Sequence, residues 1–453
     1  MHADAVVVGS GAGGGPAAAA LAESGRRVLV LEAGPRLESA DFSGAEGAML
    51  ARLFLNTTVR GSNQALYAGA CLGGSTVVND ALCFPTPATV LETWRGSGLE
   101  LAGFEGHVER VWRDVNAAPT DRAHTSRNAR HLAVGAGRLG WEAESIPRNV
   151  RGCANLGLCN FGCPTGAKQS TLLTYVPRAE RAGAQVVAET RVERVVVEAG
   201  AVRGVEVDGL LVESPLVVLA AGVLATPRIL LRSGVAAGSG FQAHSSLYVT
   251  ARFPEPVHGY YGPTMSFGVS QFAPEFMLEN VTVHPVVTAT GLPSFGAEHE
   301  RIMRRLPYLA RCVVLRRDAA RGSIDVDGKI DYPLLAEDQS ALRRGLLAAT
   351  ELYLAAGAEA VWLPLQQPHT IRDLGDAEAL LPQDMEPSRL ASLYAVHLFG
   401  GARMGDVCDE DGSVRGVSGL YVADASGLPG NTGVNPQITV LANAQRIAEG
   451  IAA

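Results

Sequence analysis

Lysine is almost missing from this chain of 453 residues, because only Lys168 and Lys329 supply it among 38 basic residues. The formal net charge is −8, which argues against nucleic acid or an anionic membrane as a partner. No stretch approaches the roughly 18 continuous apolar residues of a membrane span. Met1 stands a few residues before an apolar segment, which leaves no room for a signal peptide. We therefore expect a cytoplasmic protein without a transmembrane segment.

The cysteine content gives no sign of a disulfide framework. The seven cysteines are an odd number in a chain without an export signal, so free thiols or metal ligands are expected. We find no internal repeat, low-complexity tract or charged tail. With 47% apolar residues, a chain of this length can bury a large core and should form two structural domains.

The first thirty residues follow the order strand, glycine-rich turn, helix, strand. An apolar strand is expected at 5–8 and a second one at 27–31. Between them lie the turn GSGAGG and an alanine-rich helix that ends near Ser24. This order and spacing predict a dinucleotide-binding unit.

Each glycine of that turn has a physical task. Gly9 permits the tight turn, Gly11 lets a pyrophosphate approach the backbone, and Gly14 lets the helix pack closely on the strand. Glu32, at the end of the second strand, would accept hydrogen bonds from ribose hydroxyls. The unit alone does not separate FAD from NAD.

A second glycine-rich segment contains Gly73, Gly74, Ser75 and Asn79. It is either a surface loop before a short apolar segment or a second approach of the backbone to a bound cofactor. In the second interpretation the glycines provide access, and Ser75 and Asn79 provide hydrogen-bond donors.

Three cysteines, Cys153, Cys159 and Cys163, are spaced as C-x5-C-x3-C, and a proline follows the last of them. Thiolates from such a tight loop could bind an iron–sulfur cluster. Alternatively, they are small residues packed in a folded loop. A four-thiolate zinc site is not indicated, because no fourth ligand stands at regular spacing.

The alternating pattern at 184–212 predicts an antiparallel meander. An apolar strand at 215–220 and a helix from Thr226 to about Ser233 then return the chain to the nucleotide sheet. Residues 240–395 predict a separate domain that contains a sheet, with strands at 247–253 and 311–315 and a helix at 336–356. The scattered histidines that we interpret as structural or surface residues are His244, His258, His284, His299 and His369.

The segment near the C-terminus looks like a reaction site. His397 lies in an apolar, glycine-rich stretch, and a strand at 419–423 ends at Asp424. Asn435 is expected to cap a last helix that begins with Pro436. The start of that helix directs free N–H groups and the positive end of its dipole at whatever lies in front of it, which favours an anion.

Together these segments resemble the glucose–methanol–choline (GMC) flavoprotein oxidoreductases. The resemblance rests on four motifs in the family's order, at residues 9–14 with Glu32, 73–79, 221–234, and 397 with 435–436. It implies an α/β fold with a discontinuous FAD-binding Rossmann-like domain and a smaller α+β substrate-binding domain that contains an antiparallel sheet. The FAD-binding domain is assigned residues 1–118, 150–240 and 397–453, and the substrate-binding domain 119–149 and 241–396.

The resemblance also implies the site residues. His397 and Asn435 would form the catalytic pair that faces the isoalloxazine, with Val192 near the adenine and Asp424 near the ribityl–pyrophosphate region. The FAD would be non-covalent, since no histidine occurs near residues 69–83. The implied cofactor-binding residues are Gly9, Gly11, Gly14, Glu32, Gly73, Gly74, Ser75, Asn79, Val192, Asp424, Asn435, Pro436 and Gln437.

The function implied is oxidation of an alcohol to an aldehyde or ketone, with His397 as general base and hydride transfer to flavin N5. The pairing of His397 with Asn435 is similar to cholesterol oxidases and long-chain alcohol oxidases, which favours a fairly apolar alcohol and either dioxygen or another electron acceptor. One alternative is an iron–sulfur-containing dehydrogenase of a polyol or sugar with an electron-transfer partner. Another is a flavoprotein that binds FAD without alcohol chemistry.

Overall fold

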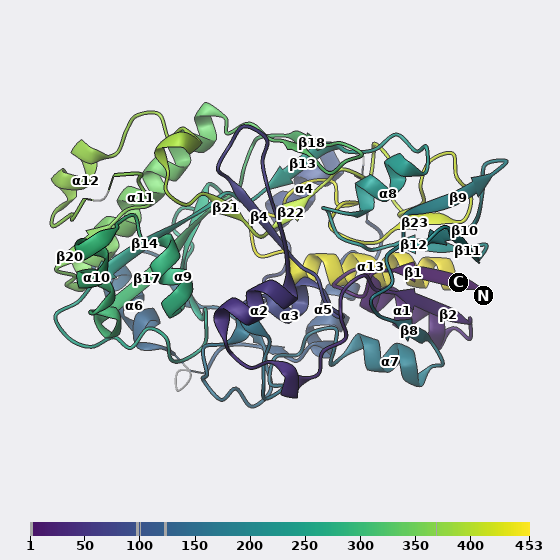
Figure 1. Ribbon diagram of the computed structural model, residues 1–453, viewed down its shortest axis with the longest axis horizontal. Helices are drawn as coiled ribbons and strands as arrows, with labels where there is room; N and C mark the ends of the chain where they lie inside the picture. Colours follow the sequence, from purple (N-terminus) through teal and green to yellow (C-terminus); the bar gives the residue numbers. More distant parts are fainter. Residues whose placement is uncertain (1–2, 97–98, 100, 122–124, 368) are drawn as a thin grey trace.

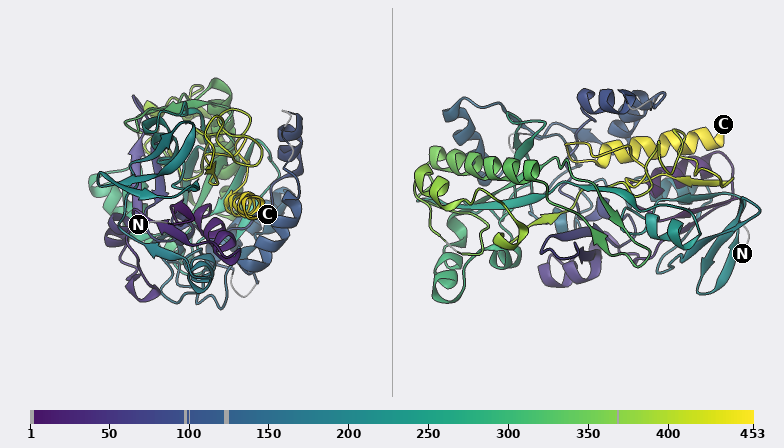
Figure 2. Two further views of the ribbon diagram at one scale, coloured as in Figure 1. Left: turned by 90° about the vertical axis from the view of Figure 1, so that its right-hand side faces the viewer. Right: turned by 90° about the horizontal axis from the view of Figure 1, so that it is seen from above.

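The computed structural model describes residues 3–96, 99, 101–121, 125–367 and 369–453, so Met1 lies outside the described part. The molecule is elongated, and two sheet-containing parts lie end to end in it (Figure 1). Both termini lie at the end that contains the parallel sheet (Figures 1 and 2). No helix of the described residues is long and apolar enough to cross a membrane.

In the described residues, the parallel sheet has five strands in the order β23-β12-β1-β2-β8. Its bounds are Leu420–Val422 for β23, Val217–Leu219 for β12, Ala5–Val8 for β1, Val28–Leu31 for β2 and Gln185–Val187 for β8. The three middle strands are buried along their whole length, as expected for apolar strands covered on both faces. Helix α1 (Gly14–Glu23) packs against α13 (Gln437–Ala452) beside this sheet.

The predicted meander at 184–212 is only partly correct. Its first strand, β8, pairs in parallel with β2 at the edge of the nucleotide sheet. The antiparallel part consists of β9 (Arg194–Glu198), β10 (Ala201–Val207) and β11 (Leu210–Glu213). An edge strand is exposed on alternate residues even when it pairs in parallel, so its sequence pattern resembles that of an antiparallel strand.

The second part is built on a larger, mainly antiparallel sheet, which has nine strands within the described ranges. Helices α6 (Arg127–Leu139) and α11 (Ala336–Ala356) pack on one face of it. The strands are β3 (Phe54–Thr58), β4 (Ala65–Gly69), β21 (Tyr394–Ala395), β14 (Ser246–Arg252), β17 (Leu309–Arg316), β16 (Phe276–Asn280), β15 (Phe267–Val269), β6 (Ala143–Ser145) and β20 (Ala360–Trp362).

Side chains alternate between the two faces of this sheet, as the strand repeat requires. Leu247 and Val249 of β14 belong to the core under the helices, whereas Tyr248 between them belongs to a different cluster on the opposite face. Strands β3 and β4 join the sheet through β21, so the segment before residue 118 contributes strands to both sheets. The predicted fold class is confirmed, and the domain boundaries stay a prediction.

A small sheet connects the two parts and brings distant segments together. It contains β13 (Ser239–Ala243), β22 (Leu398–Phe399), β18 (Gly322–Ile324) and β19 (Ile330–Asp331). Pairing of β13 with β22 places the residue after β13 beside the residue before β22. Other helices in the described residues are α2 (Glu46–Leu53), α3 (Ser75–Val78), α4 (Ala88–Gly96), α5 (Phe104–Asp114), α7 (Tyr175–Arg181), α8 (Thr226–Arg232), α9 (Pro285–Gly291), α10 (Gly296–Met303) and α12 (Leu374–Leu380).

Candidate active site

The two glycine-rich turns face each other at the end of β1. A side chain at Gly9 would overlap the carbonyl oxygen of Ala220, and its φ of 96° also favours glycine. A Cβ added to Gly11 would lie 3.6 Å from the Cα atom of Gly74. Helix α1 makes its first backbone bond at Gly15, so among the described residues the N–H groups just before Gly15 have no partner one helical turn back. These N–H groups are available to a pyrophosphate that approaches the turns.

Ser10, which the sequence analysis did not select, joins these turns. Its hydroxyl donates to Glu32 Oε2 at 2.6 Å and accepts from the backbone N–H of Gly73 at 2.8 Å. The other oxygen of Glu32 accepts from the backbone N–H of Gly34 at 2.8 Å. Burial raises the pKa of Glu32, and these hydrogen bonds oppose that shift. Glu32 thus holds the two turns in register, in addition to the ribose contact predicted for it.

Lys168 holds the second glycine-rich turn through backbone carbonyls of and beside helix α3. Its ammonium donates to the carbonyl oxygens of Val77, Asn79 and Cys159 at 2.6, 2.8 and 2.6 Å. The side chain is 2% exposed, and burial lowers its pKa to about 8. The ammonium is therefore still protonated at pH 7, and it connects helix α3 to the cysteine-containing loop.

Replacement of Lys168 by methionine is expected to destabilise the protein by roughly 3–6 kcal/mol, because three buried carbonyls lose their donor. The FAD content should fall with it, since α3 belongs to the second glycine-rich turn. Urea unfolding and the ratio of flavin to protein absorbance would measure both effects. Lys329→Met is a matched control, because this lysine is exposed and its ammonium lies 3.9 Å from the exposed carboxylate of Asp327. Equal behaviour of the two variants would contradict the role of Lys168.

Each of the three cysteines of the adjacent loop has a polar neighbour. Cys159 Sγ lies 3.2 Å from a guanidinium nitrogen of Arg148, and Cys153 and Cys163 each contact a side chain two residues further along. In the part of the chain that the structure describes, no group of three His, Cys, Asp or Glu side chains could hold a metal ion. The iron–sulfur prediction for Cys153, Cys159 and Cys163 is therefore not supported, and all seven cysteines are free thiols.

Asn79 and Gln437 connect the second turn to the last helix. Asn79 Nδ2 donates to Gln437 Oε1 at 2.7 Å, and Gln437 Nε2 donates to Asn149 Oδ1 at 3.0 Å. Ser75 Oγ accepts from the backbone N–H of Gly69 at 2.9 Å. These side chains hold protein groups together, and a cofactor would meet mainly the backbone beside them.

The prediction that Asn435 caps the last helix is wrong by one residue. Helix α13 begins at Gln437, Pro436 occupies the cap position, and no side chain caps the helix. The Oδ1 atom of Asn435 is buried without a hydrogen-bond partner among the described residues. A buried amide oxygen without a partner is costly, so Asn435 is available to a ligand at the helix start.

Glu279 of β16 lies beside Asn435, and the sequence analysis missed it. The side chain is 1% exposed, and its Oε1 atom has no partner within the described residues. Burial, followed by the charge of Asp80, raises the pKa of Glu279 to about 8, while a hydrogen bond with Asn435 opposes the shift. A buried carboxyl group that titrates near neutrality, next to an amide whose oxygen has no partner among the described residues, is typical of a reaction site.

His244, interpreted from the sequence as structural or surface, contacts His397 directly. The two Nδ1 atoms are 3.2 Å apart, and the backbone N–H of His244 donates to the carbonyl of His397 at 3.0 Å. Burial lowers the pKa of His397 to about 4 and that of His244 well below its usual value. Both imidazoles are therefore neutral at pH 7. The pairing of β13 with β22 creates this contact between residues 153 positions apart.

A backbone amide sets the tautomer of this histidine pair. The N–H of Gly433 donates to His244 Nε2 at 3.2 Å, so the hydrogen of neutral His244 is on Nδ1. His244 then donates to His397 Nδ1, which leaves the hydrogen of neutral His397 on Nε2. His397 keeps some exposure, so this N–H can reach a ligand.

The two remaining predicted residues, Val192 and Asp424, follow strands β8 and β23 of the parallel sheet. Val192 is buried close after Thr190, whose backbone N–H donates to the carbonyl of Glu32 at 2.8 Å. Asp424 is 4% exposed and accepts from the hydroxyl groups of Thr226 and Ser426 at 2.6 and 2.5 Å. The carboxylate of Asp424 thus shapes the turn after β23, and the roles of Asp424 and Val192 toward a cofactor stay predictions.

Two family models match the chain. One, described as GMC oxidoreductase, matches residues 5–248, which is more than half of the chain, and the C-terminal model of the same family matches residues 313–444. The chain belongs to the GMC oxidoreductase family. This confirms the resemblance drawn from the four motifs. GMC oxidoreductases are FAD-binding enzymes that act on CH–OH groups, so the protein is a flavoprotein oxidoreductase.

Relatives and solved structures agree with the family. The chain is 33% identical over 476 residues to an uncharacterised GMC-type oxidoreductase of Mycobacterium tuberculosis, covering 99% of this chain and 75% of that protein. It is 31% identical over 513 residues to a long-chain-alcohol oxidase of Arabidopsis thaliana, covering 100% of this chain and 67% of that protein. The structure of pyridoxine 4-oxidase from Mesorbium loti superposes with a TM-score of 0.75 at 18% identity, covering 99% of this chain and 98% of that one, which shows a shared fold.

The residues of the GMC site fit an FAD molecule. The facing turns at Gly11 and Gly74 leave backbone open to a pyrophosphate, and the N-terminus of α1 favours its negative charge. At the other end, Asn435 presents an amide oxygen without a partner beside the start of α13. Figure 1 shows that α13 begins in the middle of the molecule, between the two parts, which is where the reactive end of the cofactor is expected.

Proposed function

We propose that the protein oxidises an alcohol to an aldehyde or ketone. Bound FAD supplies the hydride acceptor for this reaction. The observation that carries the proposal is that the loop 433–435 contacts both the neutral pair of His244 and His397, through the N–H of Gly433, and the buried Glu279, through Asn435. Loss of a hydride from an alcohol carbon also requires loss of the hydroxyl proton, so the site needs a donor that orients the oxygen and a group that accepts the proton.

The hydrogen-bond pattern supports a division of these tasks between two residues. In the tautomer described above, His397 offers its Nε2–H to the alcohol oxygen and favours negative charge developing on it. Glu279, when ionised, has a free oxygen that can accept the hydroxyl proton. The sequence assigned proton acceptance to His397, and a neutral imidazole at pH 7 is compatible with that assignment if the pair changes tautomer. Asn435 would hold the substrate oxygen or the cofactor edge through its carboxamide.

The substrate is proposed to have an apolar body. On the face of the large sheet opposite α11, an apolar and aromatic cluster surrounds the region of Glu279. The cluster consists of Leu82, Phe84, Ile146, Tyr248, Met265, Val281, Val313 and Tyr394. The likeness to a long-chain-alcohol oxidase supports the same substrate class. The structure offers no observation that favours a polyol or sugar dehydrogenase with an iron–sulfur cluster.

Anaerobic mixing of the purified holoenzyme with a panel of primary and secondary alcohols tests this function. We expect bleaching of the flavin absorbance by alcohols of medium or long chain, and less by short alcohols or sugars. Parallel turnover assays with dioxygen and with an artificial dye would identify the electron acceptor. Failure of every alcohol to bleach the flavin would contradict the proposal and favour a flavoprotein without alcohol chemistry.

A further inference from the structure

A pocket of about 700 Å³ lies beside the loop 429–431, just before the segment that carries Gly433 and Asn435. It is separate from the site described above, because His244, His397, Glu279 and Asn435 do not line it. Its size is within the range of about 300–1,000 Å³ that is usual for small-molecule sites. The nature of its lining therefore indicates what it could bind.

Four arginines line the pocket, and they differ in whether a carboxylate neutralises their charge. Arg316 forms an ion pair with the buried carboxylate of Asp338 at 3.0 Å, and Arg403 reaches Asp406 at 3.4 Å. Arg317 donates through Nε to Asn431, a neutral residue, at 3.0 Å. Arg321 has no ion pair within the described residues. Two guanidinium groups in the pocket thus lack a carboxylate partner.

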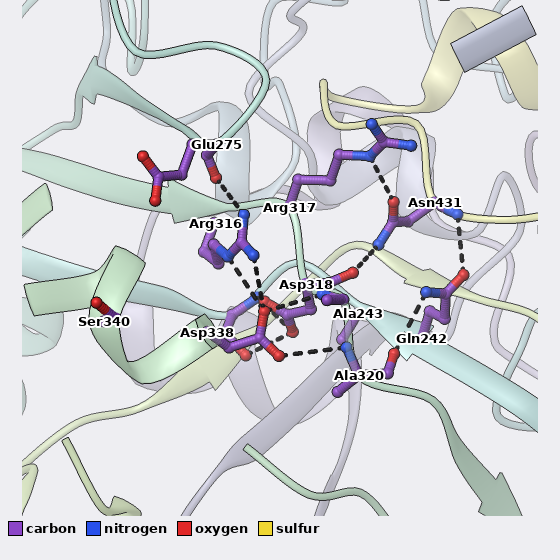
Figure 3. A network of polar contacts seen from close by, with 12 residues as sticks. Gln242, Ala243, Glu275, Arg316, Arg317, Asp318, Ala320, Asp338, Ser340 and Asn431 are labelled. Atoms are coloured by element: carbon purple, nitrogen blue, oxygen red, sulfur yellow. Dashed lines mark hydrogen bonds and ion pairs between the residues drawn. The ribbon is translucent and has the colours of Figure 1, made fainter. Parts of the chain in front are cut away.

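The carboxylates that line the pocket are already used. Glu275 is paired with Arg344, outside the pocket lining. The Asp318 carboxylate is directed away and accepts from Ser245 Oγ and Tyr332 Oη, both at 2.7 Å. Figure 3 shows the Arg316–Asp338 pair and the bond from Arg317 to Asn431 in this network. The pocket therefore has an excess of positive charge.

The electrostatics of the two unpaired arginines agree with this excess. Burial and the charge of Arg316 lower the pKa of Arg317. Burial and the charge of Arg403 lower the pKa of Arg321, although Asp406 opposes the shift. Each guanidinium group thus has a like charge as its strongest charged neighbour, which is the arrangement that an added anion relieves.

The pocket also has apolar lining residues, which are Trp94 from α4, Pro274, Met404 and Pro429. We propose that this pocket binds a small organic anion, with a carboxylate or phosphate group on Arg317 and Arg321 and an apolar body against Trp94. Inorganic phosphate would not contact the apolar lining residues, and an uncharged apolar molecule would not pair with the arginines.

The position of the pocket gives such a ligand contact with the loop of the active site. Asn431, which holds Arg317, also donates to the carbonyl of Asp318 at 2.6 Å, and its backbone N–H donates to Gln242 Oε1 at 3.3 Å. The Cδ atom of Arg317 would lie 2.9 Å from a Cβ added at Gly433. Arg317, the proposed anion-binding residue, therefore packs against the segment whose N–H sets the tautomer of His244.

Isothermal titration calorimetry of the FAD-loaded protein tests the proposal with hexanoate, hexyl phosphate and hexanamide. We expect saturable binding of at least one anion at one site, and the tighter of the two identifies the head group. Arg321→Ala and Arg317→Ala should each weaken it by about tenfold, the usual loss for one charge-assisted hydrogen bond. Arg304→Ala is the matched control, because this exposed arginine pairs with Glu300 at 2.6 Å and neither residue lines the pocket.

His397→Ala should leave this binding unchanged, which separates the pocket from the substrate site. The proposal is overturned if neither anion binds, if hexanamide binds as tightly, or if both arginine variants bind like the parent protein. It is also overturned if His397→Ala abolishes the binding, because the anion would then occupy the active site.

Discussion

Replacement of His397 by alanine is expected to lower kcat by about 10²–10³-fold, the usual loss when one hydrogen-bond donor to a developing oxyanion is removed. Bound FAD should be retained, because we expect the facing glycine turns to hold its pyrophosphate and His397 belongs to neither turn. The geometry behind this expectation is the chain of hydrogen bonds from the N–H of Gly433 through His244 to His397, which leaves His397 Nε2 as a donor. Anaerobic reduction of the flavin by alcohol measures the step, and the flavin-to-protein absorbance ratio measures FAD content.

A second substitution distinguishes donor from base. Asparagine at position 397 offers an N–H but cannot accept a proton at neutral pH. If His397 acts as a donor, His397→Asn should recover part of the rate that alanine loses. If asparagine and alanine are equally slow, the imidazole itself accepts the proton, as the sequence analysis predicted. The exposed His369→Ala provides the control, and an active His397→Ala enzyme would remove His397 from the mechanism altogether.

Glu279→Gln is expected to lower turnover by roughly 10²–10⁴-fold, the range for loss of a general base. Burial and Asp80 raise the pKa of Glu279 to about 8, so at pH 7 most molecules hold it protonated. A protonated carboxyl group cannot accept another proton. In the parent enzyme, kcat/KM should therefore rise with pH until about 8 and level off above it.

The glutamine variant should lose this pH dependence together with the rate, since glutamine keeps the shape of the side chain and does not titrate. Glu144→Gln makes the same change at an exposed glutamate on strand β6 of the same sheet. This control variant should keep the parent profile. A parent profile that is flat between pH 6 and 9 would exclude Glu279 as the proton acceptor.

Much of the fold could be predicted because its signals are local. The GxGxxG turn with its flanking strands, the helix at 336–356 and the strands near 247 and 311 were all found within a few residues of their observed bounds. Strand β8 was assigned to the wrong sheet because an exposed edge has the same alternation in both kinds of sheet. Asn435 was assigned to the wrong position because Asn-Pro is a common helix start, and only the unpaired oxygen indicates another task.

The active site was predicted unevenly for a similar reason. His397 and Asn435 stand in motifs that the family pattern identifies, whereas His244 and Glu279 stand in no motif. Glu279 looked like one charged residue in an apolar strand, and nothing in the sequence showed that Lys168 is buried. Full burial makes these residues functional candidates, and burial of a charged group depends on neighbours from other parts of the chain.

The sequence by itself determined the family and indicated the candidate FAD-binding turns and His397 as a candidate catalytic residue, because each depends on residues that are adjacent in the chain. Tertiary structure decided which groups surround them. Pairing of β13 with β22 places His244 against His397, and the face of β16 turned away from α11 places Glu279 against Asn435. Proton affinity depends on desolvation and on charges a few ångströms away, so it follows from these contacts between distant segments and not from the order of residues.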